Sequence, residues 1–256
     1  EILQRPIYML FSGPSTGPTV AQQFVQEEES NDALLIDMGG TSFDVSTVID
    51  GQVTMTRDGR INDHPTGISA VEILTMGAGG GSIAHVDSGG LLRVGPKSAG
   101  SEPGPACYQR GGTLPTVTDA YVALGYLVPE HFLGGRMDLS VNAAIDAITK
   151  YVANPLGLNL EAAALGILRV VNERMINGIL EMTVRRGVDP RGLSLVTGGG
   201  ATGVAAVELA RELGITRIIV PRETSVLCAL GAVNADLKWS NVTSVSTTVD
   251  TFLDQE

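Results

Sequence analysis

Hydrophobic residues form one continuous segment near the start of the chain, and two alternating segments follow it. Residues 33–38 are apolar except for one acid close to the end, as in a strand that is buried on both faces. Residues 44–49 and 52–57 flank Asp50-Gly51, a dipeptide that strongly favours a hairpin turn. Residues 34–57 are therefore predicted to form three consecutive strands, with a glycine bend joining the first two.

The remaining periodic segments predict several helices and two further strands. Helices are expected at 14–30, 118–126, 142–153, 160–186, 201–214 and 225–237, and strands at 193–200 and 216–221. The segment 160–186 keeps helical spacing for about seven turns and should stop before Gly187. Residues 241–252 alternate with polar side chains and predict a strand or a tail.

The stretch 58–118 is the least regular part of the chain and is rich in glycine and proline. Within it, "SIAHVDSGGLLRVG" (82–95) predicts a second hairpin. Glycine and proline at this density interrupt regular elements, and long loops in compact proteins are usually functional. We therefore expect the rest of this stretch to form an ordered loop or lid.

Composition favours a compact α/β protein and excludes several classes of function. The chain has 256 residues, of which 43% are apolar and 32 are glycine, enough for one large domain or two closely joined ones. Its net charge of −11 argues against nucleic acid as a partner, because nucleic acid requires clustered Lys and Arg. No apolar stretch approaches the roughly 20 residues that cross a bilayer, so no membrane partner is expected.

Cysteine usage and the first residues indicate the setting of the protein. Cys107 and Cys228 are too few for a disulfide framework, so a reduced, cytoplasmic compartment is expected. The first residues lack the basic start and apolar core of a signal peptide. They also lack an initiator Met, and we expect the chain to come from something longer.

The segment "LLIDMGGTSFDVSTVIDGQ" places a carboxylate and a glycine bend at the end of the first strand. Gly39 and Gly40 would leave backbone N–H groups open to a phosphate, since no Cβ stands in the way. Asp37 could hold Mg²⁺ directly or through water, because Mg²⁺ uses hard oxygen ligands near phosphates. Thr41 and Ser42 add hydroxyl donors. The alternative is an ordinary hairpin turn in which the aspartate only shapes the turn.

A second glycine segment, "VTGGGATG" (196–203), also follows a strand and begins a helix. Helix N-termini favour anions, and Gly198, Gly199 and Gly200 would permit the close approach of a ligand. A Rossmann site fits poorly, because no acid follows about 20 residues on at the end of a second strand. The P-loop pattern GxxxxGK[ST] does not occur.

Four other residues are weaker candidates for contacts with a substrate or lid. His85 on the second hairpin has either an active-site role or an ordinary surface position, and no two histidines have metal-ligand spacing. Cys107 would need a nearby histidine and a lowered pKa to act as a nucleophile. Asp119 most simply starts a helix, and Asp44 either serves the site or only fixes the hairpin. Cys228, inside an apolar helix, is expected in the core.

Several distinctive segments occur in a fixed order along the chain. They are "SGPSTGP", "DMGGTSFDVSTVIDG", the glycine-rich stretch 77–112, "PTVTDA", "FLGGRM", "DPRGLSLVTGGGATG" and "VLCALG". This order resembles the hydantoinase A/5-oxoprolinase family over residues 5 to about 238. The family includes the ATP-hydrolysing subunits of N-methylhydantoinase, acetone carboxylase and acetophenone carboxylase.

The resemblance implies an actin/Hsp70/sugar-kinase-like ATPase fold, an α/β architecture in which two ribonuclease-H-like lobes close on a nucleotide. Residues 1–240 would form the second lobe, with a glycine- and proline-rich insertion at 58–118 and a helical part at 142–187. Residues 241–256 would form a C-terminal strand or tail. No first-lobe phosphate loop precedes Arg5, so we expect the first lobe on another chain or in a missing segment.

The resemblance also assigns roles to the two glycine segments. Asp37, Gly39, Gly40 and Thr41 match the phosphate loop of the second lobe, and residues 198–200 match the loop that borders adenosine. ATP and Mg²⁺ are therefore the implied cofactors. Asp37 would be the catalytic acid that holds the metal or orients water.

The family's chemistry implies a subunit or fragment of an ATP-dependent enzyme that phosphorylates a carbonyl or enolate oxygen. The activated substrate would be a lactam, hydantoin or 5-oxoproline ring that is hydrolysed, or a ketone that is carboxylated, with a slight preference for the ketone. A hydantoinase B-like subunit would be the partner. The alternative is a non-catalytic structural subunit that retains an inactive ATPase lobe, and a small-molecule kinase is a third reading.

Overall fold

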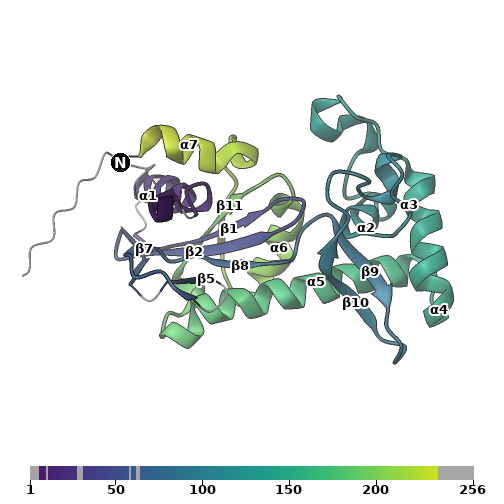
Figure 1. Ribbon diagram of the computed structural model, residues 1–256, viewed down its shortest axis with the longest axis horizontal. Helices are drawn as coiled ribbons and strands as arrows, with labels where there is room; N and C mark the ends of the chain where they lie inside the picture. Colours follow the sequence, from purple (N-terminus) through teal and green to yellow (C-terminus); the bar gives the residue numbers. More distant parts are fainter. Residues whose placement is uncertain (1–5, 10, 28–30, 58, 62–63, 236–256) are drawn as a thin grey trace, which may run out of the picture.

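A six-stranded mixed sheet forms the centre of the computed structural model, which describes residues 6–9, 11–27, 31–57, 59–61 and 64–235 (Figure 1). Its strands are β1 (Ala33–Met38), β2 (Phe43–Ile49), β3 (Gln52–Val53), β8 (Leu74–Met76), β11 (Ser194–Gly198) and β12 (Arg217–Ile219). The order is β12-β11-β1-β2-β3, and β8 also pairs with β2. β1 runs parallel to β11 and antiparallel to β2.

The predicted bend and hairpin connect the first three strands of this sheet. β1 and β2 pair along their full length across the glycine bend. Asp50 and Gly51 both adopt positive φ, at 52° and 70°, as the two central residues of a tight hairpin turn require. The prediction of β1 and β2 is therefore confirmed.

Helices cover both faces of the sheet, so that the molecule has three layers here. They are α1 (Gly17–Glu27) and α7 (Leu227–Asn234) on one face, and α5 (Leu160–Met182) and α6 (Thr202–Leu213) on the other. Leu34 and Ile36 of β1 pack in one core cluster with α5 and α6, whereas Ala33 and Leu35 pack in another with α1 and α7. The continuous apolar character of β1 follows from this burial on both faces.

A smaller part of the molecule lies beside the sheet, between β8 and α5 in the chain (Figure 1). It contains β9 (Ser82–Val86), β10 (Leu92–Ser98), η3 (Ala106–Tyr108), α2 (Val117–Ala123), η4 (Pro129–Gly134), α3 (Val141–Ile148), η5 (Thr149–Ala153) and α4 (Asn154–Leu156). The hairpin β9–β10 confirms the prediction for 82–95. Helix α5 contacts both β8 of the sheet and β10 of the smaller part, and so connects the two.

Capping residues mark the ends of several predicted helices. The side chains of Ser140 and Asn159 accept hydrogen bonds at the starts of α3 and α5. Gly214 ends α6 with φ of 69°. Short helical turns complete the fold: η1 (Pro6–Met9), η2 (Pro14–Thr16), η6 (Val184–Arg186), η7 (Pro190–Gly192) and η8 (Thr224–Val226). In the described part of the chain, no helix is long and apolar enough to cross a membrane.

The structure corrects the predicted third strand and the predicted irregular stretch. Residues 52–57 do not form one strand: β3 ends at Val53, and β4 (Met55–Thr56) pairs with β7 (Ala70–Val71) outside the central sheet. The stretch 58–118 contains β8, which joins the central sheet beside β2, and a small pair formed by β5 (Arg60–Ile61) and β6 (His64–Pro65). Local pattern missed β8 because its pairing partner is about 30 residues earlier. The predicted strand or tail at 241–252 lies outside the described residues.

Close packing of α7 against η2 generates a stability prediction. A Cβ on Gly231, inside α7, would overlap the carbonyl oxygen of Thr16. Gly231→Ala should therefore lower the free energy of unfolding by about 1–3 kcal/mol. Gly203 in α6 has nothing within 4 Å of its Cβ position, so Gly203→Ala should be neutral or stabilising by up to ~1 kcal/mol. Urea denaturation of both variants measures the difference, and equal stabilities would contradict the predicted contact.

Candidate functional site

The two glycine segments predicted from the sequence lie side by side at the end of β1. Asp37 pairs in register with Gly198 of β11 on one side and with Asp44 of β2 on the other. The N–H of Ala201 donates to the carbonyl of Met38 over 3.0 Å, which joins the second glycine segment directly to β1. The structure therefore brings the predicted phosphate loop and the predicted adenosine loop together.

Thr202, at the start of α6, fixes this junction. Its hydroxyl oxygen accepts the N–H of Met38 over 2.7 Å and donates to the carbonyl of Gly198. Between these residues, Gly199 adopts φ of 80°. A Cβ on Gly199 would overlap both the Met38 carbonyl and the Asp37 carboxylate. Only glycine fits this position without displacing the end of β1.

A third glycine segment, Gly79–Gly81, completes the junction and was not assigned from the sequence. The N–H of Gly80 donates to the carbonyl of Gly39 over 3.0 Å, and the N–H of Gly81 donates to the carbonyl of Gly40 over 2.7 Å. A Cβ on the first glycine of the segment would lie 2.8 Å from the Gly40 backbone. The available signal was a glycine run directly after β8, the same pattern as in the other two segments.

Several backbone donors of the junction remain available to a ligand. Within the described residues, the N–H groups of Gly40, Thr41 and Gly200 donate to no acceptor. The N–H of Gly39 instead closes the bend onto the carbonyl of Ser42 over 3.2 Å. Gly40 and Thr41 are exposed residues at the tip of the bend. Such clustered N–H groups suit an anion.

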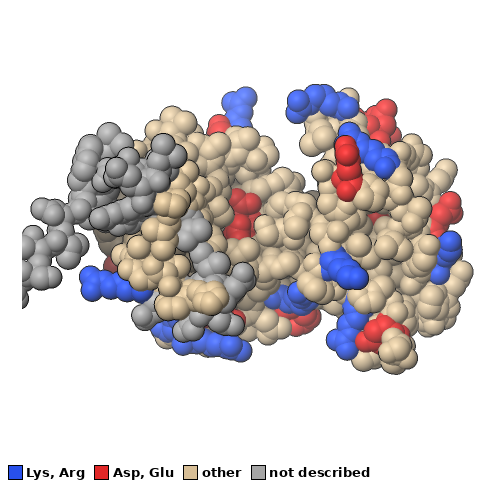
Figure 2. Space-filling view, viewed as in Figure 1, with Lys and Arg blue, Asp and Glu red and all other residues tan. Residues whose placement is uncertain are grey.

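A cleft of about 720 Å³ begins at the glycine segments and extends towards the smaller part. Gly39, Gly40, Gly80, Gly200 and Ala201 line its sheet side. Its other side is aromatic and basic, and is formed by Tyr108, Tyr121, Tyr126, Phe132, His131 and Arg136. In Figure 2 charged side chains are scattered over the visible face, and the outline is indented between the sheet and the smaller part.

The Asp37 carboxylate is half-buried and has two notable neighbours. Burial raises its pKa; the thiol of Cys228, which donates to Oδ2 over 3.3 Å, acts in the opposite direction, and the charge of Asp44 raises the pKa further. Burial and the Asp37 charge raise the pKa of Cys228 to about 12, so the thiol stays protonated at neutral pH. Cys228 is thus half-buried beside the site, whereas the sequence suggested a core position.

Asp37 and Asp44 form a carboxylate pair across β1 and β2. Thr75 of β8 donates to Asp44 over 2.6 Å, and burial raises the pKa of Asp44. No group of three or more His, Cys, Asp or Glu able to hold a metal ion occurs among the residues that the structure describes. The pair nevertheless fits Mg²⁺, because this ion commonly uses one or two carboxylates and completes its shell with water and phosphate oxygens.

The structure places His85 outside the glycine junction. It lies exposed on β9 and lines a separate hollow of about 890 Å³ together with Arg93, Lys97 and Arg174. None of the three glycine segments lines that hollow, which is formed mainly by the hairpin β9–β10 and α5. A role of His85 in substrate contact remains a prediction.

Asp119 and Cys107 are buried together under η3. The Asp119 carboxylate accepts the N–H groups of Ala106 and Cys107, the latter over 2.7 Å, and also the N–H and hydroxyl of Thr116. It therefore caps α2 and anchors the loop that carries Cys107. Burial, followed by the Asp119 charge, strongly raises the pKa of the Cys107 thiol. These contacts stabilise the fold of the loop, and neither residue lines the cleft.

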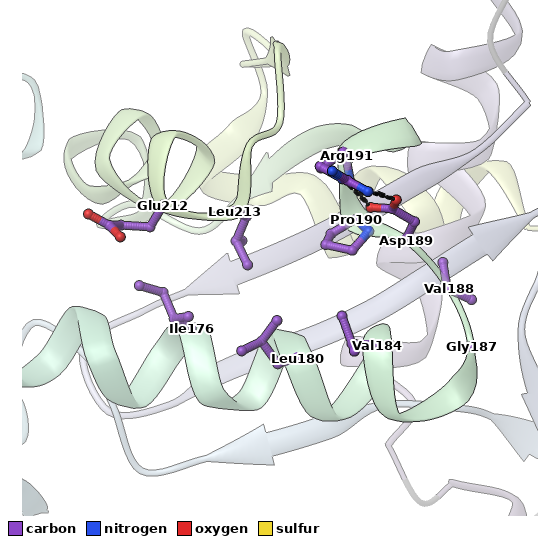
Figure 3. Close-up of a pocket in the computed structure, with 10 residues that line it drawn as sticks. All are labelled: Ile176, Leu180, Val184, Gly187, Val188, Asp189, Pro190, Arg191, Glu212 and Leu213. Carbon is purple, nitrogen blue, oxygen red and sulfur yellow. Dashed lines mark hydrogen bonds and ion pairs between the residues drawn. The ribbon is translucent and has the colours of Figure 1, made fainter.

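Another hollow, of about 550 Å³, lies between the C-terminal part of α5 and the end of α6 (Figure 3). Ile176, Leu180 and Leu213 line it, and an exposed ion pair between Asp189 and Arg191 lies at its edge, with 2.6 Å between Oδ2 and Nη2. It contains none of the predicted site residues. The glycine junction is therefore the stronger candidate site.

Comparison with known proteins identifies the family of the chain. A sequence profile described as Hydantoinase/oxoprolinase matches residues 1–241. The chain belongs to this family. The family relationship inferred from the ordered segments is confirmed.

Two relatives and one solved structure show the extent of the similarity. The chain is 41% identical to caprolactamase subunit alpha of Pseudomonas jessenii, over 99% of this chain and 36% of that protein. It is 39% identical to the acetophenone carboxylase gamma subunit of Aromatoleum aromaticum, over 93% and 32%. A nucleotide-free structure of acetone carboxylase superposes with a TM-score of 0.82 at 30% identity, over 88% of this chain and 32% of that one.

These similarities confirm the predicted α/β ATPase-lobe fold of this family. The chain spans about a third of the length of the curated relatives it matches. The activity of a whole enzyme therefore needs separate argument, and the individual site residues remain predictions that rest on the geometry of the junction.

The positive φ of Gly199 at the junction gives a mutational prediction. Gly199→Ala should lower the free energy of unfolding by about 2–4 kcal/mol, because it combines a positive φ with overlap against β1. Gly200→Ala is the matched control, since its Cβ position is open and its φ is not positive. Thermal denaturation compares the two. A loss for Gly200→Ala as large as that for Gly199→Ala would show that the packing against β1 is not the cause.

The raised pKa of Asp37 predicts a pH-dependent stability effect. Between the unfolded value, 3.8 for an ordinary aspartate, and the higher folded value, the native state binds more protons than the unfolded chain. This stabilising contribution is therefore present at low pH and lost as the pH rises through the folded pKa. Asp37→Asn should have a higher thermal midpoint than the parent at about pH 7 and a smaller difference near pH 4.

Differential scanning fluorimetry across pH measures this effect. Asp146→Asn, an exposed aspartate on α3, is the control and should leave the midpoint almost unchanged at both pH values. A lower midpoint for Asp37→Asn at neutral pH would refute the idea that the buried charge destabilises the fold.

Proposed function

We propose that this chain is the nucleotide-binding part of an ATP-dependent enzyme, with the phosphates held at the end of β1. The observation that carries the proposal is the meeting of three glycine segments around the half-buried carboxylate of Asp37. The unpaired N–H groups of Gly40, Thr41 and Gly200 supply donors that match phosphate oxygens. The cleft volume lies in the usual range of small-molecule sites, about 300–1,000 Å³.

The rest of the cleft suits the nucleoside. Gly200 and Ala201 lie on its sheet side, and Tyr108, Tyr126 and Phe132 lie on its opposite side. Aromatic side chains offer flat surfaces for a purine base. A nucleotide would then extend from the bend at Gly40 along the second glycine segment towards the aromatic residues, as the resemblance to an adenosine loop suggests.

Asp37 and Asp44 would hold Mg²⁺ beside the phosphates. When bound, the ion would neutralise phosphate charge and so favour transfer of the terminal phosphoryl group. The chain's own residues have the complementary tasks: the glycine N–H groups orient the phosphates, and the Asp37 carboxylate accepts a proton or orients a water. Phosphoryl transfer depends mainly on such positioning.

The proposed reaction moves the terminal phosphoryl group of ATP to a carbonyl or enolate oxygen and releases ADP. Water then opens a lactam, hydantoin or 5-oxoproline ring and phosphate leaves. For a ketone, bicarbonate supplies the carboxyl group to the phosphorylated enolate, and phosphate leaves with one bicarbonate oxygen. Lactam-acting and ketone-acting relatives match almost equally, at 41% and 39% identity, so the proposal includes both substrate classes. The proposal further includes a cytoplasmic setting, a first ATPase lobe on another chain or in a missing segment, and a hydantoinase B-like partner subunit.

Substitution of Asp37 tests the proposal in the complete enzyme that contains this chain. Asp37→Asn should lower the rate of ATP hydrolysis about a hundredfold or more, because it removes a charge that faces the phosphates. Asp146→Asn should retain the parent rate. Unchanged hydrolysis by Asp37→Asn in a folded enzyme would favour the alternative, a structural subunit with an inactive lobe.

The same enzyme can separate the two substrate classes. Hydrolysis of ATP that requires both a ketone and bicarbonate would indicate carboxylation, whereas hydrolysis stimulated by a lactam or hydantoin without bicarbonate would indicate ring opening. Activity with neither class would overturn this part of the proposal without affecting nucleotide binding, which equilibrium titration with ATP and Mg²⁺ measures.

A further inference from the structure

Cys228, the second residue of α7, contacts the candidate site from the face of the sheet that α1 and α7 cover. Its thiol donates to Oδ2 of Asp37 over 3.3 Å, across 191 positions of the sequence. Asp37 is otherwise flanked by Asp44 in β2 and Gly198 in β11. The thiol is thus the side-chain donor that the structure directs at the central carboxylate.

The segment "SGPSTGP" (12–18) holds this thiol in position. The Thr16 hydroxyl donates to the carbonyl of Cys228 over 2.6 Å. A Cβ on Gly17 would lie 3.2 Å from the Cys228 sulfur and 2.9 Å from Leu35, so the absence of a side chain there lets α7 approach β1. Gly231 has the same function one turn later, because its Cβ would overlap the Thr16 carbonyl. The packing of α7 against β1 thus gives a structural role to the segment "SGPSTGP", which does not line the candidate nucleotide site.

The two oxygens of Asp37 therefore have different surroundings. Oδ2 accepts the thiol proton and lies 2.9 Å from the Cβ position of Gly198, whereas Oδ1 has no hydrogen-bond donor among the described residues and lies against Gly199, where a Cβ would overlap it. A carboxylate fixed at one oxygen cannot rotate freely, and its other oxygen keeps a constant direction towards the glycine segments. Thiols are weak donors, but a donor to an ionised acceptor counts for more than one between neutral groups.

We infer that Cys228 is a positioning residue: its neutral thiol orients the Asp37 carboxylate towards the glycine junction, and η2 with Gly17 holds the thiol in place. The catalytic consequence of this inference rests on the proposed function, whereas the hydrogen bond is independent of it. Cys228 is neither a nucleophile nor a core residue in this arrangement. A thiolate at this position would place a second negative charge against Asp37.

Infrared spectroscopy of the full protein tests the hydrogen bond without reference to activity. The S–H stretching band lies in a region with little other protein absorption and moves to lower frequency when the thiol donates. The difference between the parent and Cys228→Ala isolates the Cys228 band, because Cys107 contributes equally to both. Asp37→Ala should shift this band upwards, while Leu230→Ala, which loosens α7 without touching Asp37, should not. If the frequency of the Cys228 band is the same in the parent and in Asp37→Ala, the inference is overturned.

Kinetics of the complete enzyme test the catalytic consequence. Cys228→Ala should lower kcat for ATP hydrolysis roughly tenfold with little change in KM, because the hydrogen bond to a charged group is lost. Cys228→Ser should recover at least part of that loss, since a hydroxyl donates to the same oxygen. Leu230→Ala controls for weakened packing of α7 and should retain the parent kcat despite a lower thermal midpoint.

The outcomes separate this inference from the proposed function. If Asp37→Asn leaves hydrolysis unchanged, the nucleotide site is misassigned, and the infrared band still decides whether the thiol donates. If Asp37→Asn abolishes hydrolysis but Cys228→Ala and Cys228→Ser match the parent, the nucleotide site stands and the positioning role is refuted. Equal losses for alanine and serine in folded enzymes would also refute it.

Discussion

Close approach of three backbone segments at the end of β1 is the constraint on which the rest of the structure depends. The run Gly79–Gly81 donates hydrogen bonds to the bend at Gly39–Gly40, and a Cβ on Gly79, Gly81 or Gly199 would overlap the backbone at the end of β1 or in the bend. These segments come from distant parts of the chain. The sheet, α6 and the smaller part must each be in place before the junction can form. The geometry of the candidate site therefore depends on the complete fold.

Electrostatics at the junction work against stability and in favour of binding. Asp37 and Asp44 lie side by side and half-buried, where ionised carboxylates are poorly solvated. The fold compensates in part with donors from neighbouring elements, Thr75 for one carboxylate and Cys228 for the other. Sites that bind charged ligands commonly retain such unfavourable arrangements. A cation between the carboxylates and anionic phosphates beyond them would relieve the repulsion.

Local signals in the sequence were sufficient for β1, β2, the main helices and two of the three glycine segments. β1 is apolar except for Asp37, the Asp50-Gly51 turn has its own backbone preference, and α5 keeps a long helical period. The missing features depend on long-range contacts. β8 is three residues long and is recognised as a strand only by its pairing with β2. Gly79–Gly81 is recognised as part of the site only by its hydrogen bonds to the bend, and Cys228 only by its contact with Asp37. Apolar surroundings in the sequence did not reveal that the thiol borders the site.

Helix α5 joins the central sheet to the smaller part of the molecule. Its 23 residues form a rod of about 35 Å, which lies under the sheet at one end and against β10 and the smaller part at the other. A continuous helix therefore packs against both the sheet and the smaller part. The same helix lines two hollows, through Val170 and Arg174 beside β10 and through Ile176 and Leu180 in the hollow of Figure 3, so any displacement of α5 along its axis would change the shape of both.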